Sequence, residues 1–199
     1  MSRDTFKLIL ALAAIVIGIG SMLSGRPVER APGVLAPDNP WQQELLDAGP
    51  LQHGEYALTP RAEFRLEARV LSAERYRWDG GAGLAPVDLA LGWGPMSDSS
   101  MLDRFKVTQG ARFYTLYPQD EAVDLALALR HSANMHLIPA SDAVRRTLES
   151  ARAGQVVSLR GQLVDAVRPD GFAWRSSLTR EDTGAGACEL VYVESAALR

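Results

Sequence analysis

The longest apolar stretch of the chain lies near its N-terminus. From Leu8 to Gly25 the sequence LILALAAIVIGIGSMLSG contains no charged residue. A helix of about 17 to 25 residues crosses a hydrocarbon core of about 30 Å, so this run predicts one membrane-spanning helix. The best candidate for a cleavage site, Gly18-Ile19-Gly20, fits the small-residue pattern poorly. We therefore expect residues 1–25 to be an uncleaved anchor whose partner is the lipid bilayer.

Basic residues flank this apolar run on both sides and leave its orientation weakly determined. Arg3 and Lys7 precede the run, and Arg26 and Arg30 follow it, whereas an excess of basic residues normally marks the cytoplasmic side. A single N-terminal span without a second apolar run is the usual way to tether an exported domain. We therefore expect a single-pass protein of the cell inner membrane, with its domain on the periplasmic or extracellular side.

Proline spacing predicts how the domain follows the anchor. Residues 26–38 contain three prolines, which favour an extended, semi-rigid tether that holds the domain off the bilayer. One soluble domain is then expected over residues 39–199. Its first element is predicted to be a short helix over 39–49, with Asn39 as the cap and Pro40 in the first turn.

Alternation with a period of two appears in the middle of the domain. In AEFRLEARV, Phe64, Leu66 and Val70 alternate with charged residues, which is typical of a strand with one solvated face. The aromatic-rich ARFYTLYP (111–118) predicts another strand. The following QDEAVDLALALRHS fits a helix and a strand equally well. We interpret APVDLALGWGPMSDSS (85–100) as a structured loop that a tryptophan pins to the core.

The C-terminal part combines one capped helix with several strands. Ser141 is expected to cap a helix that runs to Arg152, and Gly154 to end it. From Gln155 the segments QVVSLRGQLVDAV, FAWRSSL and CELVYVESA predict three strands, with a bend at Gly161. These features predict a small barrel-like, OB-like C-terminal sheet. The fold class is therefore an α+β, β-rich domain behind a transmembrane helix.

Composition narrows the classes of ligand. The 199 residues are 47% hydrophobic and 23% charged, with a net charge of -3 and the two signs intermixed. No basic block indicates nucleic acid, so an unknown protein or small ligand is the expected partner, and no cofactor is indicated. The single cysteine, Cys188, excludes an internal disulfide and a thiolate zinc cluster.

The motif RHSANMHLIPA contains the first group of candidate reactive side chains, His131, Asn134 and His136. We interpret it first as a polar loop whose side chains satisfy backbone groups. If the motif is functional, His136 is the acid/base or metal ligand and Asn134 the group that orients it. The histidines are five residues apart, which differs from the helical zinc-protease spacing. His131 and His136 are metal candidates only if a loop brings them together.

The second candidate chemistry uses Cys188 with His136. A thiolate is a strong nucleophile when an imidazole stabilises it, and the small residues before Cys188 would let backbone amides approach an oxyanion. The alternation along CELVYV also fits a cysteine buried on one face of a strand, which is the simpler interpretation.

Three motifs, PVDLALGWGPMSD, SANMHLIPA and WRSSLTREDTGAGACELVYV, together resemble an uncharacterised family of bacterial membrane-anchored proteins. The resemblance implies one anchored domain and assigns no activity. We therefore favour a non-enzymatic binding or envelope-assembly module over an enzyme. The alternative is a thiol- or metal-dependent hydrolase that uses Cys188 and His136.

Overall fold

The structure is a computed structural model, and the residues that it describes are 26–179 and 188–199. Within these residues the main sheet comprises β1 (Trp41–Glu44), β2 (Leu51–His53), β3 (Tyr56–Arg75), β4 (Val87–Gly92), β7 (Ser132–Pro139), β8 (Val156–Val167), β9 (Ala173–Trp174) and β10 (Glu189–Leu198). A separate hairpin pairs β5 (Phe105–Gly110) with β6 (Phe113–Pro118). The helical elements are a 3-10 turn (Gly94–Ser97), α2 (Ser99–Leu102), α3 (Leu125–Arg130) and α4 (Asp142–Glu149). The predicted β-rich α+β class is confirmed.

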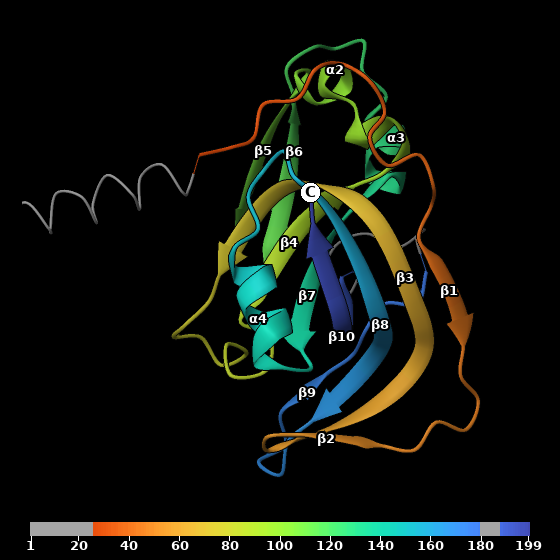
Figure 1. Ribbon diagram of the computed structural model, residues 1–199, viewed down its shortest axis with the longest axis vertical. Coiled ribbons are helices and arrows are strands. Elements are labelled where there is room, and N and C mark those ends of the chain that lie inside the picture. Colours follow the sequence, from red (N-terminus) through yellow and green to blue (C-terminus); the bar gives the residue numbers. More distant parts are fainter. Residues whose placement is uncertain (1–25, 180–187) are drawn as a thin grey trace, which may run out of the picture.

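Five of these strands pair in a closed circuit. β3 pairs with β4, β4 with β7, β7 in parallel with β10, β10 with β8, and β8 again with β3. The circuit closes because β3 is 20 residues long and bends, so that one part pairs with β8 and the other with β4 (Figure 1). Alternate residues of each strand fill the interior, as in small barrels. The largest buried cluster contains Phe64, Leu89, Met135, Leu159 and Val191.

The barrel differs from the predicted C-terminal sheet in its extent. β8 and β10 pair with each other, but β8 also pairs with β3 and β10 also pairs with β7. The C-terminal strands therefore close a sheet that begins at Tyr56, and they do not form a unit of their own. The predicted capped helix is α4, and its Val144 and Leu148 pack into the main core.

Several element predictions are confirmed. The alternating segment around Phe64 is β3, and ARFYTLYP contains β6. The Ser141 side chain accepts a hydrogen bond from the Val144 N–H and caps α4. Trp93 is buried, as expected of a tryptophan that pins a loop. The ambiguous segment is α3 in its second half.

Three other element predictions are wrong. The predicted helix over 39–49 is strand β1, because pairing with β3 satisfies its backbone and the Arg65 guanidinium lies 4.7 Å from the Trp41 ring centre. The predicted loop at PVDLALG is β4, and the predicted polar loop at SANMHLIP is β7. β4 is buried on both faces, so its sequence is an almost continuous apolar run. β7 does alternate polar and apolar residues, but its polar face is buried and not solvated.

Residues 28–36, in the segment predicted to be a semi-rigid tether, lie against the domain. The Val28 N–H donates to the Ala153 carbonyl at 2.7 Å, and the Ser97 Oγ accepts from the Ala36 N–H at 3.1 Å. Ala36 is fully buried. A Cβ atom at Gly154 would lie 1.8 Å from the Val28 carbonyl oxygen, so this close approach requires glycine.

Within residues 26–179 and 188–199, none of the helices is both long and apolar enough to cross a bilayer. The predicted anchor over residues 1–25 lies outside the described residues.

Candidate functional site

A buried polar cluster lies on the outer face of β4 and β7. Leu89 and Met135 point into the barrel, whereas Asp88, Asn134 and His136 lie on the opposite face and are almost completely buried. The register places Asp88 opposite His136. We call Asp88, Arg112, Asn134, His136 and Trp174 the Asp88 cluster. The β5–β6 hairpin, the β3–β4 loop and β9 supply the groups that cover it.

The Asp88 carboxylate is the centre of the cluster. Its Oδ1 accepts a hydrogen bond from Arg112 Nη1 at 2.8 Å, and its Oδ2 lies 2.9 Å from His136 Nδ1. The geometry of this contact does not meet the criteria of a hydrogen bond. Asn134 Nδ2 donates to the same Oδ2 at 3.4 Å. Two polar neighbours and a guanidinium thus compensate a fully buried charge.

Arg112 joins the cluster to the loop before β4. Its guanidinium donates two hydrogen bonds to the Asp79 carboxylate, at 2.8 and 2.7 Å, and one to the Ala85 carbonyl at 2.7 Å. The guanidinium carbon also lies 3.7 Å from the Tyr76 ring centre and 5.5 Å from the Trp174 ring centre. Arg112 therefore closes the loop and the hairpin over β4.

The hairpin turn aims Arg112 at this position. Gly110 pairs with Phe113, so the loop contains only Ala111 and Arg112, whose φ angles are 49° and 70°. Two positive φ angles define the turn type that suits a two-residue hairpin, although Asn and Gly are the usual residues there. The Arg112 N–H donates to the Tyr76 hydroxyl at 2.9 Å, and this bond helps to hold the strained backbone in place.

The ionisation of these groups follows from their contacts. Burial lowers the pKa of Arg112, but its hydrogen bonds to Asp79 and the charges of both aspartates outweigh burial and raise it. The hydrogen bond from Arg112 lowers the pKa of Asp79. Burial raises the pKa of Tyr76. The guanidinium, the Asp79 carboxylate and the neutral phenol are therefore the stable forms at neutral pH.

Asn134 does not orient His136 in the manner expected from the sequence. Its Oδ1 accepts from Gln109 Nε2 at 2.7 Å, and its Nδ2 donates to the Arg112 carbonyl at 3.0 Å. The group beside the imidazole is Asp88, and the His136 ring also lies 4.5 Å from the Trp174 ring. Sequence reasoning missed Asp88, Arg112 and Trp174. The available signal was one aspartate inside the apolar run PVDLALG, because such a charge requires a partner.

The two candidate metal-binding histidines lie far apart along the chain path, because His136 is in the middle of β7 and His131 comes before the strand. His131 precedes the strand, and its Nδ1 lies 2.9 Å from the Leu127 carbonyl in α3. Five residues of extended chain separate the two histidines by about 16 Å, so both cannot bind one ion. In the described part of the chain, no group of three or more His, Cys, Asp or Glu side chains could hold a metal ion.

Cys188 lies beside the Asp88 cluster at the start of β10. The parallel pairing places Leu190 next to His136, so Cys188 is two residues before the neighbour of His136. The thiol is half-buried and lies near Tyr114. Burial raises the pKa of Tyr114, its hydrogen bond with Ser132 opposes this, and the thiol raises it further. Adjacent strands thus bring Cys188 and His136 into one region.

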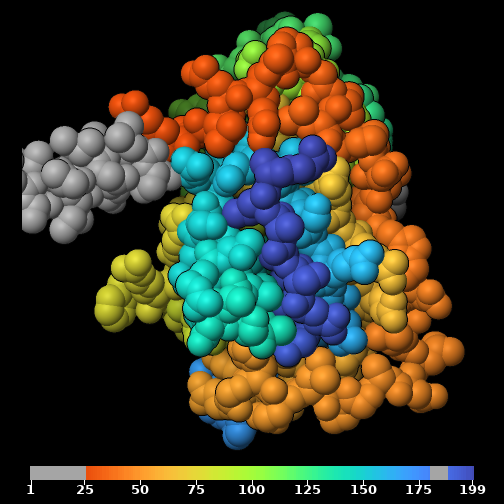
Figure 2. Space-filling model, in the orientation of Figure 1, coloured from red at the N-terminus to blue at the C-terminus, as the bar shows by residue number. Residues whose placement is uncertain are grey.

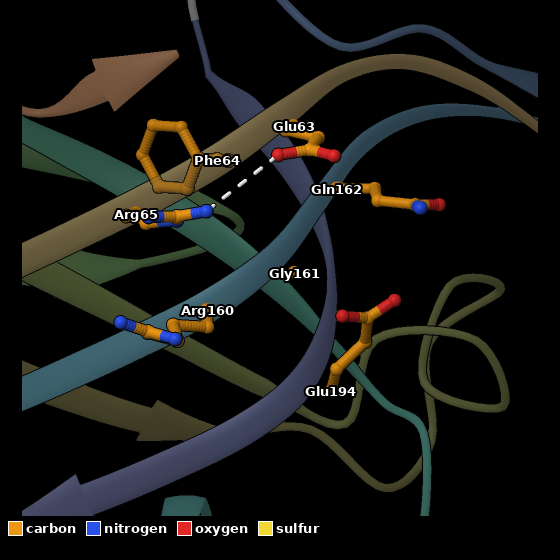
Figure 3. Close-up of a pocket in the computed structure, with 7 residues that line it drawn as sticks. All are labelled: Glu63, Phe64, Arg65, Arg160, Gly161, Gln162 and Glu194. Atoms are coloured by element: carbon orange, nitrogen blue, oxygen red, sulfur yellow. Dashed lines mark ion pairs between the residues drawn. The ribbon is translucent and has the colours of Figure 1, made fainter. Parts of the chain in front are cut away.

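A small hollow is lined by residues of β3, β8 and β10 (Figure 3). It has a volume of about 190 Å³ and is lined by Glu63, Phe64, Arg65, Arg160, Gly161, Gln162 and Glu194. In Figure 3 the two arginines lie on one side, and Glu63, Gln162 and Glu194 lie on the other. Ligand pockets usually measure about 300 to 1,000 Å³, so this hollow has room for water or a small ion but not for a larger ligand.

Comparison with known proteins assigns no family to the chain. No family model, curated protein or solved structure matches it. The resemblance of three motifs to membrane-anchored proteins therefore stays an expectation, and function has to be argued from geometry.

Proposed function

We propose that the protein is a membrane-anchored, non-enzymatic binding module with an OB-like barrel that binds an oligosaccharide on the outer face of its β5–β6 hairpin. The closed order β3–β4–β7–β10–β8 supports the OB-like assignment. In such barrels, oligonucleotides and oligosaccharides bind over the second and third strands and the adjoining loops. Here these strands are β4 and β7.

The observation that carries the proposal is an exposed aromatic face on the hairpin that covers this region. Phe113 and Tyr117 are each 50% exposed and lie on the same side of β6, about 13 Å apart. Thr108 lies opposite Thr115 between them. The buried side of the hairpin packs Phe105 and Leu116 against the domain, so the exposed rings are held on a fixed surface.

The chemistry of this face suits an uncharged, extended ligand. Exposed aromatic rings provide flat apolar contacts at low entropic cost, and the threonine hydroxyls both donate and accept hydrogen bonds. Lys106, opposite Tyr117, is the one basic residue of the paired strands β5 and β6, which is too little charge for a polyanion. An oligosaccharide meets these conditions, and an exported domain would encounter one in the cell envelope.

The test is a calorimetric titration of the full chain in detergent with an oligomer of N-acetylglucosamine. We expect binding that Phe113→Ala and Tyr117→Ala each weaken at least tenfold, while Val167→Ala, which changes an exposed residue of β8, has no effect. Absence of binding, or equal affinity of all four proteins, would exclude this function. Circular dichroism of each variant checks that the fold is retained.

The placement in the cell is part of the same proposal. We infer a single-pass inner-membrane protein with its domain on the exported side, on the basis of the uncharged run from Leu8 to Gly25. An impermeant maleimide supplied to intact bacteria should label a Leu46→Cys variant that also carries Cys188→Ser, because Leu46 is 90% exposed. Labelling only after lysis would place the domain in the cytoplasm.

A thiol hydrolase is the second candidate function, because Asp88, His136 and Cys188 lie on three adjacent strands. A nucleophilic cysteine requires a stabilised thiolate, and a normal thiol has a pKa of about 8.5. Alkylation of Cys188 should then be rapid at neutral pH and should slow in the His136→Asn variant. Slow alkylation that this substitution leaves unchanged would exclude the thiol hydrolase.

A further inference from the structure

We propose that the surface formed by Arg75, Arg77, Trp78 and Arg152 docks on the bilayer that holds the N-terminal segment, and that an anionic phospholipid headgroup occupies the cavity between Arg75 and Arg152. This inference rests on the membrane anchor in the proposed function. It does not depend on the oligosaccharide site.

The path of the chain brings this surface close to the bilayer. Val28 is fixed to Ala153 by a hydrogen bond of 2.7 Å, and Gly154 allows the two segments to touch. Only Arg26 and Pro27 lie between the uncharged run and Val28. Three residue steps span at most about 10 Å. A bilayer that contains the uncharged run must therefore lie next to Ala153 and its neighbour Arg152.

The cavity beside this attachment point has the size and charge for a headgroup. It measures about 460 Å³ and is lined by Arg75, Glu149, Ser150, Arg152 and Gln155. Ligand pockets usually measure about 300 to 1,000 Å³. The Arg152 side chain makes no hydrogen bond or ion pair within the described residues, so its guanidinium is available for a phosphate, which arginine binds with two parallel hydrogen bonds.

Hydrogen bonds also fix the Arg75 side chain at the edge of this cavity. Its Nε donates to the Glu149 carbonyl at 2.5 Å and its Nη2 to the Ala151 carbonyl at 3.4 Å. These bonds satisfy carbonyls at the C-terminal end of α4, whose negative dipole would otherwise repel an anion. The remaining N–H groups of Arg75 can serve a ligand.

Charge on this side of the domain matches an anionic membrane. The basic groups are Arg26, Arg75, Arg77 and Arg152, and the acidic groups next to them in the sequence or in the cavity are Glu29, Glu74, Asp79 and Glu149. Asp79 is already paired with Arg112, which leaves four arginines and three carboxylates that are unpaired within the described residues on this side of a chain whose net charge is -3. Each basic residue close to anionic lipid strengthens binding about fivefold.

Trp78 provides the apolar contact. Its side chain is 96% exposed, although Arg112 fixes the adjacent Asp79 with two hydrogen bonds. Figures 1 and 2 show that the β3–β4 loop protrudes on the same side of the domain as the start of the described chain at residue 26. An indole ring at the headgroup level is the usual role of tryptophan at membrane interfaces.

The experiment places the full chain in nanodiscs of phosphatidylcholine, with and without phosphatidylglycerol, that contain lipids brominated near the headgroup. Bromine quenches a nearby indole, so subtracting the Trp78→Phe signal isolates Trp78. We expect quenching that increases with phosphatidylglycerol and loses this increase in Arg152→Gln. The matched control is Arg160→Gln, which removes an equal charge from the hollow in Figure 3.

Four results would contradict the inference in distinguishable ways. A chain that does not co-purify with nanodiscs would overturn the anchor and the docking surface together. A chain that co-purifies but shows no Trp78 quenching would overturn the docking surface alone. Quenching that does not increase with phosphatidylglycerol, or that increases equally in Arg152→Gln, would overturn the headgroup site. Two copies per disc with a shielded Trp78 would indicate that a second copy covers the surface.

Discussion

Arg112 is a residue whose removal we expect to destabilise the fold strongly, because its guanidinium is paired with a buried carboxylate. In Arg112→Met, the fully buried Asp88 carboxylate loses its guanidinium. Breaking a buried ion pair in this way costs about 3 kcal/mol, mainly because the remaining charge is unpaired. Urea denaturation should show this loss in the free energy of unfolding.

A matched control for this experiment is Arg104→Met, which breaks an exposed ion pair with Asp120 of 2.6 Å. Exposed pairs contribute about 0 to 1 kcal/mol, so this variant should be close to the parent protein. Adding Asp88→Asn to Arg112→Met should restore part of the lost stability. Equal losses for Arg112→Met and Arg104→Met would show that the Asp88 cluster is not the buried centre described here.

Tyr114 gives a prediction about alkaline pH. Burial raises its pKa above the usual value of 10.0, so the folded state favours the neutral phenol. The stability from this preference is fully present below pH of about 10, where the unfolded chain is also neutral, and is lost as the pH rises through the folded-state pKa. The free energy of unfolding of Tyr114→Phe should therefore fall less steeply above pH of about 10 than that of the parent. A difference between the two proteins that is constant with pH would contradict this.

Residue roles were the least predictable feature of the sequence. Ser132, Asn134 and His136 form one face of β7 and alternate with Ala133, Met135 and Leu137. The period of two was therefore present, but the density of polar residues was interpreted as a loop. Asp88 reaches Arg112 across 24 residues. No local pattern specifies such a contact, because it depends on how the hairpin folds back over β4.

At the scale of elements, prediction succeeded where local forces decide. β3 has charges on its solvated face, and α4 has a serine cap, so both were predicted correctly. β1 was predicted as a helix from Asn39 and Pro40, yet it gains its hydrogen bonds from the distant residues 62–65. Weak local preferences were overridden there by pairing with a long strand.

Gly161 is the element-scale test of barrel closure. A Cβ atom at this position would lie 1.9 Å from the Tyr192 carbonyl oxygen, so Gly161→Ala must push β10 away from β8. We expect the free energy of unfolding to fall by about 3 kcal/mol, as overpacking against backbone is not easily relieved. Chemical denaturation measures the change.

Gly171→Ala separates this clash from the general effect of replacing a glycine. Gly171 has a φ of +93°, but no atom lies within 4 Å of a Cβ placed there. Only backbone strain of about 1 kcal/mol is expected. If Gly161→Ala is no more harmful than Gly171→Ala, β10 does not approach β8 as closely as described.

At the scale of the whole molecule, closure of the barrel could not be predicted from any one segment. It requires β3 to pair with both β4 and β8, and β10 to run parallel to β7. These partners are far apart in sequence. The entropic cost of closing the loops between them depends on loop length, so no local segment indicates which pairs form. The sequence therefore predicted the β-rich class, but placed the barrel only at the C-terminus.

The packing of residues 28–36 against the domain also depends on contacts between residues that are far apart in the sequence. If residues 28–36 belong to the domain, a chain that begins at Asn39 should be less stable than one that begins at Arg26. The shorter chain loses the bond between Val28 and Ala153 and the bond of 2.7 Å from the Gly94 N–H to the Ala36 carbonyl. It also exposes the Ser97 hydroxyl. Leaving such groups without partners costs about 1 to 3 kcal/mol each, so we expect a total loss of about 3 kcal/mol after the ordering entropy of the segment is subtracted.

Urea denaturation of the two proteins tests this. Equal stabilities would mean that residues 28–36 are a tether and do not hold the domain close to the bilayer. The geometric reason for placing Arg152 and Trp78 at the lipid surface would then be lost.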